Sequence, residues 1–290
     1  MTKTTIRQII ERRMPGDGLF QTGIRGVQLF RATEAVPCVP AVYEPCVIAI
    51  VSGAKEAVLD GYHHVYDHRD YLICPVSMPV EAGTPTAAPD KPLMGVYIAL
   101  DTRLMMELTM EMGHAAVTKP VAEARGIRLS PWDDGFAEAL LRLVQLEDAA
   151  DLSILGEARL RELHYAILKG DAGAFARQAF APGNGIARAI SHLSNHLHDT
   201  VSIDDMATRA GMSRAVFHRR FKEATTMSPI QFTKAMRLNH AAMKISAGMT
   251  VSAAAMDVGY VSPSQFSREF KRMYGASPRQ WSATSESGRS

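Results

Sequence analysis

The spacing of apolar residues divides the chain into a strand-rich first part and a helical second part. Over residues 27–100, short apolar runs such as CVIAIV and LMGVYIAL alternate with segments such as LDGY and TAAPDKP. This alternation is typical of strands joined by turns. From residue 101 onward, apolar residues recur every three or four positions, as Phe136, Leu140 and Val144 do. That spacing predicts amphipathic helices.

Residues that mark helix boundaries refine this division. Ser130 followed by Pro131 predicts that a helix begins there, with serine as the N-cap and proline at the first helical position. Gly170 predicts the end of a later helix, and the segment APGNG is the candidate hinge. The pattern therefore predicts an α+β multidomain protein, with strands and a helical annex over residues 1–180 and an all-helical domain over residues 186–290.

One short unit occurs twice near the C-terminus. GMSRAVFHRRFKEATTMSPIQF begins at Gly211, and GYVSPSQFSREFKRMYGASPRQW begins at Gly259. In each copy a helix reaches the glycine, a serine comes next, and two phenylalanines one turn apart mark the buried face of the second helix. The glycines lie 48 residues apart, but Phe221 and Phe270 lie 49 apart, so the second turn has one additional residue. Each copy is predicted to be a helix-turn-helix.

The outward positions of the second helix in each copy carry cationic and hydrogen-bonding side chains. This chemistry suits phosphates and the base edges of the DNA major groove, although helical hairpins with a basic face also occur in repeat scaffolds. Pro263 fits the start of a helix, where its missing N–H costs nothing. The candidate DNA-binding residues are Arg214, Ala215, His218, Arg219 and Lys222 in the first copy and Ser264, Gln265, Arg268 and Lys271 in the second.

Charge is distributed unevenly between the two parts. Residues 1–180 contain 18 Lys and Arg against 23 Asp and Glu, a net charge of −5, whereas residues 181–290 contain 14 against 7, a net charge of +7. A basic segment after an acidic one favours a nucleic-acid-binding module attached to a module with another role.

Composition argues against several classes of protein. A hydrophobic content of 47% with 21% charged residues is ordinary for a globular protein. The apolar run CVIAIV is far shorter than a membrane span, and MTKTTIRQIIERR lacks the apolar core of a signal peptide, so a cytoplasmic protein is expected. Cys38, Cys46 and Cys74 lack CxxC spacing, which argues against a disulfide framework and a structural zinc site. No cofactor is expected.

The duplicated region resembles the DNA-binding domain of the AraC/XylS family of bacterial transcription regulators. The segments that carry the resemblance are IDDMATRAGMSRAVFHRRFKEATTMSPIQF, the connecting RLNHAAMKI, and AAMDVGYVSPSQFSREFKRMYGASPRQW. In this family two helix-turn-helix motifs are joined by one long helix, and two recognition helices enter successive segments of the major groove. The resemblance covers residues 186–281 and implies that these residues face bases: Ala215, His218 and Arg219 in the first motif, and Ser264, Gln265 and Arg268 in the second.

Two features of this match bear on base reading. Ala215 stands where many relatives carry a larger polar or aromatic residue, so the first helix is expected to read fewer bases, through His218 and Arg219. Lys222 and Lys271 either bind phosphate or only solvate the surface, and the sequence leaves both alternatives open.

The first part of the chain resembles the cupin-like effector domain of an AraC/XylS subgroup. The resemblance spans residues 27–101 and implies a small β-barrel. Such a barrel either fills its interior with side chains or holds one small ligand. The effector-binding residues are unknown from the sequence. The family pattern is carried by Pro45, Gly53, Lys55, Gly61, Tyr66, Tyr71, Leu72 and Pro79.

Two other functions compete with a ligand-responsive regulator. His63, His64 and His68 suggest a metal-dependent cupin enzyme. However, adjacent strand residues point to opposite faces and no suitably spaced glutamate completes a ligand set, so neither a metal site nor an enzyme is expected. The second alternative is a thiol-redox-sensing regulator that uses one of the three cysteines.

The sequence thus predicts a sequence-specific DNA-binding transcription regulator whose N-terminal domain senses a small molecule. Activation is the expected mode, although the residues themselves do not separate activation from repression. Effector binding would change how the two DNA-binding motifs are presented. The expected partners are double-stranded operator or promoter DNA, an unidentified effector, RNA polymerase, and a second copy of the chain that docks through the apolar stripes of residues 130–170.

Overall fold

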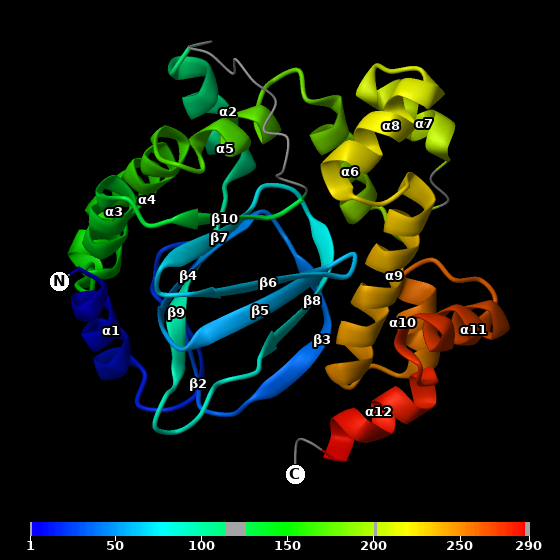
Figure 1. The fold of residues 1–290 in the computed structure, drawn as a ribbon, viewed down its shortest axis with the longest axis horizontal. Helices are drawn as coiled ribbons and strands as arrows, with labels where there is room; N and C mark the ends of the chain where they lie inside the picture. The colour runs from blue at the N-terminus through cyan, green and yellow to red at the C-terminus, as the bar shows by residue number, and fades with distance from the viewer. Residues whose placement is uncertain (1, 114–125, 200–201, 288–290) are drawn as a thin grey trace. The chain divides into compact units, whose positions relative to one another are not determined.

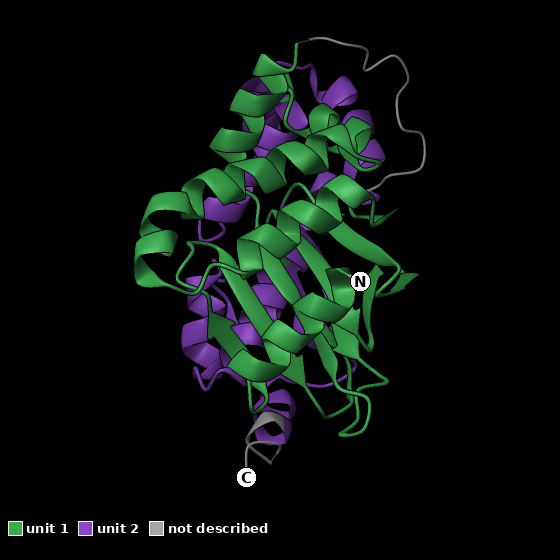
Figure 2. Ribbon diagram, turned by 90° about the vertical axis from the view of Figure 1, so that its left-hand side faces the viewer, with its two compact units in different colours: residues 1–39, 43–76, 82–184 green, residues 40–42, 77–81, 185–290 purple. Residues whose placement is uncertain are grey.

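The chain divides into two compact units, coloured separately in Figure 2. The computed structural model describes residues 2–113, 126–199 and 202–287. Unit 1 comprises Met1–Val39, Tyr43–Val76 and Ala82–Asn184, and unit 2 comprises Pro40–Val42, Ser77–Glu81 and Gly185–Ser290.

Strands fill the region where apolar runs alternate with turns, and two more lie outside it (Figure 1). One sheet has the antiparallel order β1-β2-β9-β4-β7-β10, and a second sheet has the order β3-β8-β5-β6. The strands are β1 (Gly18–Gln21), β2 (Val27–Ala32), β3 (Val36–Tyr43), β4 (Cys46–Ser52), β5 (Ala54–Leu59), β6 (Tyr62–Asp67), β7 (Asp70–Cys74), β8 (Met78–Thr84), β9 (Leu93–Ala99) and β10 (Arg128–Pro131).

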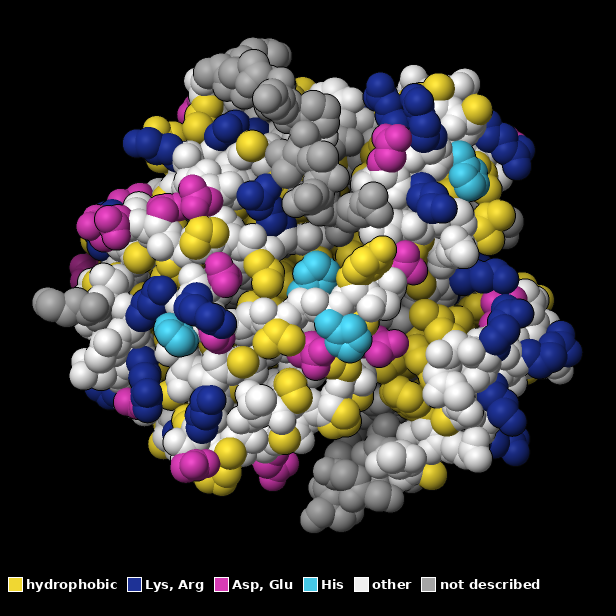
Figure 3. Space-filling view, viewed as in Figure 1, with side chains coloured by type: hydrophobic (Ala, Val, Ile, Leu, Met, Phe, Trp, Pro, Cys, Tyr) yellow, Lys and Arg dark blue, Asp and Glu magenta, His cyan; other side chains and the backbone are white. Residues whose placement is uncertain are grey.

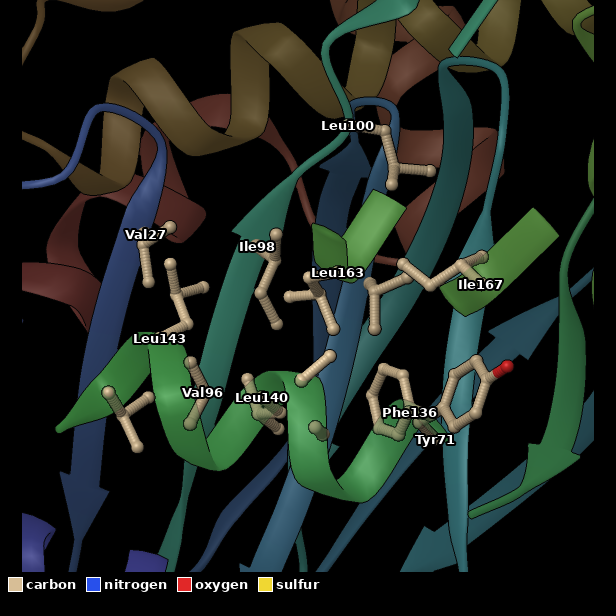
Figure 4. Packing of buried hydrophobic residues seen from close by; sticks show 14 of the residues in the cluster. Val27, Tyr71, Val96, Ile98, Leu100, Phe136, Leu140, Leu143, Leu163 and Ile167 are labelled. Carbon is tan, nitrogen blue, oxygen red and sulfur yellow. The ribbon is translucent and has the colours of Figure 1, made fainter. Parts of the chain in front are cut away.

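Helices cover one face of the six-stranded sheet. Residues 46–51 of β4 are all buried, which explains why that strand is a continuous apolar run rather than an alternation. The ring of Phe136 stacks on that of Tyr71 at 4.1 Å between centroids. Burial of each such side chain stabilises the fold by about 1.5–3 kcal/mol. Figure 4 shows the packing of Val27, Val96 and Ile98 with Leu140, Leu143, Leu163 and Ile167.

Five helices in the described part of unit 1 agree with the sequence pattern, with one omission. They are α1 (Thr2–Arg13), α2 (Thr102–Glu111), α3 (Asp134–Val144), α4 (Ala149–Lys169) and α5 (Gly173–Ala179). The predicted helix end at Gly170 is confirmed, since this residue is the C-cap of α4. Helix α1 was not predicted, although its buried residues Ile6, Ile9 and Ile10 have helical spacing.

The prediction that a helix begins at Ser130 and Pro131 is wrong. Both residues belong to β10, where Ser130 pairs with Tyr71 of β7. Helix α3 begins only at Asp134, because the Asp133 side chain accepts a hydrogen bond from the backbone N–H of Phe136 at 2.8 Å and so caps the helix. Proline is tolerated at the end of β10 because this strand lies at an edge of its sheet.

The described residues after 184 form helices, and with the two sheets of the preceding part of the chain this confirms the α+β multidomain prediction. Gly211 and Gly259 adopt φ of +70° and +85° at the two predicted turns. Pro263 is the first residue of its helix, as predicted. The helices are α6 (Gly185–Asn195), α7 (Ile203–Ala210), α8 (Arg214–Thr225), α9 (Pro229–Ser246), α10 (Val251–Asp257), α11 (Pro263–Tyr274) and α12 (Pro278–Ser287).

The two copies also share the junction between the second helix of each motif and the helix after it. The C-cap residues of α8 and α11 are Thr226 and Gly275, and both adopt the left-handed conformation. The next helix then begins with a serine whose side chain accepts from the N–H of a glutamine three residues on, while that glutamine side chain accepts from the serine N–H. The first of these junctions leads into the connecting helix α9, which is 18 residues long, and the second leads into α12.

Candidate nucleic-acid interface

The buried face of each recognition helix fixes which side chains reach solvent. Phe217 and Phe221 anchor α8, and Phe266 and Phe270 anchor α11, all of them fully or almost fully buried. The outward residues therefore result from helical geometry. Of the nine candidate DNA-binding residues, His218 is half-buried and the other eight are exposed: Arg214, Ala215, Arg219, Lys222, Ser264, Gln265, Arg268 and Lys271.

Sequence reasoning missed Arg272 on the second recognition helix. This residue is exposed and lies one turn beyond Arg268, on the same face as Ser264. The i, i+4, i+8 spacing of these three residues could have found it. Figure 3 shows Lys and Arg side chains gathered over the helices of unit 2, consistent with the net charge of +7 over residues 181–290.

Two arginines of the first recognition helix lie beside carboxylates. The Arg214 guanidinium donates to the Asp204 carboxylate at 3.2 Å, and Arg219 lies 4.0 Å from Glu223. All four side chains are about two-thirds exposed, so these pairs stabilise the fold little. The pairs do, however, place negative charge next to two side chains that would have to meet phosphates or bases.

The second recognition helix carries a different kind of acid. Glu269 is 13% exposed, and its carboxylate accepts hydrogen bonds from Lys234 of α9, from the Tyr260 hydroxyl and from the Gln265 side-chain amide. Burial alone would raise the pKa of Glu269, but these three hydrogen bonds lower it overall. The carboxylate is therefore ionised and fully engaged inside the motif.

Unit 1 contains a second candidate site, on the face of β5 and β6 that carries the buried residues. Lys55 and Tyr66 are cross-strand partners on β5 and β6, and the Tyr66 and Tyr43 hydroxyls lie 3.4 Å apart. Lys55 shares its face of β5 with buried Ala57. Burial lowers the pKa of Lys55 and raises that of Tyr43. In the part of the chain that the structure describes, Lys55 makes no hydrogen bond or ion pair.

Two of the three cysteines do not have the features of a reactive thiol site. Cys46 and Cys74 lie opposite each other on β4 and β7, and burial raises the pKa of both thiols. A thiol with a raised pKa has little of the thiolate form that reacts with oxidants. Cys38 is partly exposed, and the three cysteines form no disulfide in the described chain.

The histidines considered as metal ligands belong to no cluster of three possible ligands in the described part of the chain. His63 contacts the Glu56 carboxylate and is exposed, whereas His64 is half-buried. Over residues 2–113, 126–199 and 202–287, no three His, Cys, Asp or Glu side chains lie close enough to hold a metal ion. Among these same residues, no helix is long and apolar enough to cross a membrane.

Two family models match the chain. One is described as the AraC-type transcriptional regulator N-terminus and matches residues 23–175, which is more than half of the chain. The other is described as a helix-turn-helix domain and matches residues 206–284.

Curated relatives match parts of the chain. It is 38% identical over 84 residues to the HTH-type transcriptional regulator MtrA of Neisseria gonorrhoeae, covering 29% of this chain and 28% of MtrA. It is 30% identical over 90 residues to the regulatory protein SoxS of Escherichia coli, covering 31% of this chain and 84% of SoxS. Identity to the HTH-type transcriptional activator RhaS of Escherichia fergusonii is 25% over 151 residues, covering 49% and 51%. The match therefore spans about half of RhaS or less than a third of MtrA.

Solved structures of ToxT from Vibrio cholerae share the fold. A 1.65 Å structure gives a TM-score of 0.56 at 10% identity, covering 88% of this chain and 97% of ToxT. ToxT bound to (E)-4-(8-methylnaphthalen-1-yl)but-3-enoic acid gives a TM-score of 0.57 at 10% identity, covering 89% and 98%. At such low identity the likeness concerns the fold alone.

Proposed function

Because the chain belongs to the AraC family of transcription regulators, we propose that residues 186–290 bind operator DNA through α8 and α11. Residues 1–180 then bind the effector and a second copy of the chain. The observation that supports DNA binding most directly is the exposure of cationic and amide side chains on two duplicated helices. A cytoplasmic location is part of the same proposal. So are contact with RNA polymerase and transcriptional activation, the latter supported by the name of RhaS.

The candidate DNA-binding residues divide into base readers and phosphate anchors. Arg219 and Arg268 occupy matched outward positions, where a guanidinium can donate to guanine O6 and N7 together. Lys222 and Lys271 lie three residues further along and contact phosphate. Among the remaining residues, His218, Ser264 and Gln265 can form hydrogen bonds with bases. The Arg214 guanidinium can pair with a backbone phosphate, whereas Ala215 offers only a methyl group for an apolar contact.

A salt series separates these two roles. The full chain is titrated with a duplex enriched from a random pool and with its scrambled counterpart. Arg219→Ala and Arg268→Ala should each reduce discrimination by about 1–3 kcal/mol. Lys222→Ala should weaken binding to both duplexes alike and reduce the salt slope by about one unit. If the arginine variants bind the enriched duplex and the scrambled duplex more weakly by the same factor, the arginines are phosphate anchors.

The effector is proposed to be a carboxylate bound against Lys55. A partly buried ammonium group without a partner is unfavourable, and a ligand carboxylate would compensate it. Tyr43 and Tyr66 provide aromatic surface and hydroxyl groups beside it. ToxT has been determined with an unsaturated fatty acid and with a butenoic acid derivative, both of them carboxylic acids.

Thermal shift measurements test this assignment. Octanoate should raise the melting temperature of the full chain, whereas octanamide, which has the same apolar tail without the charge, should not. Lys55→Met should remove the difference between the two compounds. An equal response to both compounds, or a response to octanoate that survives in Lys55→Met, would contradict a role for the Lys55 charge.

The proposed dimer interface is the outer side of α4. Ile154 is 75% exposed and Tyr165 is 43% exposed on this helix. Between them Arg161 pairs with Glu107 and Glu111 of α2, so its charge is compensated within the unit. Sedimentation at micromolar concentration should find dimers that Ile154→Glu dissociates, and monomers of the unmodified chain would contradict this interface.

A further inference from the structure

Glu269 joins the second helix-turn-helix to the connecting helix α9. Its Oε1 accepts from Lys234 Nζ of α9 at 3.2 Å and from Gln265 Nε2 of α11 at 3.3 Å, and its Oε2 accepts from the Tyr260 hydroxyl at 2.8 Å. Lys234 is 35 residues away along the chain. The carboxylate therefore fixes the recognition helix against the connecting helix as well as holding one outward side chain.

The chemistry of this carboxylate determines how the Gln265 amide is oriented. An ionised carboxylate can only accept hydrogen bonds, so the group of Gln265 that faces it must be the amide NH2. The oxygen and nitrogen of a glutamine side chain are otherwise hard to distinguish, and the hydrogen-bond network settles the choice. Gln265 is exposed. It consequently keeps one N–H and its carbonyl oxygen for an outside partner.

This remaining donor and acceptor fit one base edge in the major groove. Adenine presents an acceptor, N7, beside a donor, the N6 amino group, whereas guanine presents two acceptors. A free glutamine can adjust its amide, but Gln265 is tied to Glu269. We propose that Gln265 reads an adenine and that Glu269 is the positioning residue that makes it do so. This inference rests on the proposed function, in which α11 enters the major groove.

Selection from a random duplex pool by the full chain tests the proposal. The unmodified chain should enrich a motif that contains an adenine whose preference is lost in Gln265→Ala. Glu269→Gln should lose the same preference by on the order of tenfold, because a neutral amide can donate as well as accept and no longer fixes Gln265. Preferences at other positions should persist, which distinguishes positioning from general destabilisation.

Glu223→Gln is the matched control, since it removes an exposed acid from the first recognition helix. It should leave the adenine preference unchanged. If the position lost in Gln265→Ala is not adenine, or if a folded Glu269→Gln keeps the adenine, the inference is wrong while DNA binding stands. If the unmodified chain enriches no motif, the proposed function fails with it. Should Glu269→Gln not fold, the identity of the base lost in Gln265→Ala still decides the proposal.

Discussion

The two helix-turn-helix copies have the same backbone plan but use their acidic residues in opposite ways. In the first copy, Asp204 and Glu223 are exposed and lie beside arginines of the proposed DNA-binding face. In the second copy, Glu269 is almost buried and binds groups of its own motif and of α9. In the proposed DNA complex, acids of the first kind would compete with phosphates for the arginines, whereas an acid of the second kind would organise the surface that meets DNA. An acidic residue on a recognition helix is thus interpreted by its contacts rather than by its charge alone.

The copies also differ in how tightly their turns are packed. A methyl group added at Gly259 would lie 2.8 Å from the His198 carbonyl oxygen. A methyl group added at Gly211 would have no such neighbour within 4 Å. Rings from Tyr260, Tyr274 and Trp281 extend the aromatic cluster of the second copy. The second copy is therefore expected to tolerate less change than the first.

The largest expected effect tests this difference in packing. Gly211→Ala should destabilise unit 2 by about 1–2 kcal/mol, the cost of a left-handed backbone for a residue with a side chain. Gly259→Ala should cost a further 1–3 kcal/mol, roughly, because a backbone oxygen must move. Urea unfolding of the full chain, monitored by the helical circular dichroism signal, measures both. Equal costs for the two substitutions would show that the contact at Gly259 is relieved without strain.

A smaller effect of opposite sign is expected at the ends of the recognition helices. Thr226 has φ of +70°, and its hydroxyl oxygen is buried without a hydrogen bond in the described chain, whereas the second copy has Gly275 at the matched position. Thr226→Gly should therefore stabilise unit 2 by about 1 kcal/mol. The same unfolding measurement applies, with Gly275→Thr as the reverse substitution. A loss of stability in Thr226→Gly would mean that threonine makes compensating contacts.

The smallest effect concerns the exposed acids of the first copy. Asp204→Asn should raise the affinity for DNA by about two- to fivefold, since an exposed ion pair is worth roughly 0.2–1 kcal/mol and no longer competes for Arg214. Fluorescence anisotropy at low salt measures the change. Asp257→Asn is the control, because Asp257 pairs with Lys244 of α9 instead of a candidate DNA-binding residue. Equal gains in both variants would indicate only the change in net charge.

Local signals in the sequence were sufficient for the turns and the buried faces of the motifs. A glycine at a left-handed position and two phenylalanines one turn apart depend on neighbouring residues alone. The start of α3 could not be read in this way, because Ser130 and Asp133 are both suitable caps. Pairing of β10 with β7, about 60 residues earlier, decides between them.

The same limit applies to the candidate site. The outward residues of α8 and α11 were predictable from helical periodicity. The engagement of Glu269 was not, because Lys234 comes from another helix and its distance from Glu269 is a property of the folded motif. The partly buried Lys55 stood out only as part of a family pattern, since nothing in the sequence indicates that its ammonium group lacks a partner.

Helix α9 is a spacer of fixed length between the two motifs. Its 18 residues span about 27 Å at roughly 1.5 Å per residue, and nine of its side chains are buried, so it cannot stretch as a flexible linker would. The B-DNA groove returns to the same side of the duplex about every 34 Å. Operators should therefore keep a constant separation between the segments that the two motifs contact. Inserting about half a helical turn of base pairs between these segments would carry one of them to the opposite side of the duplex.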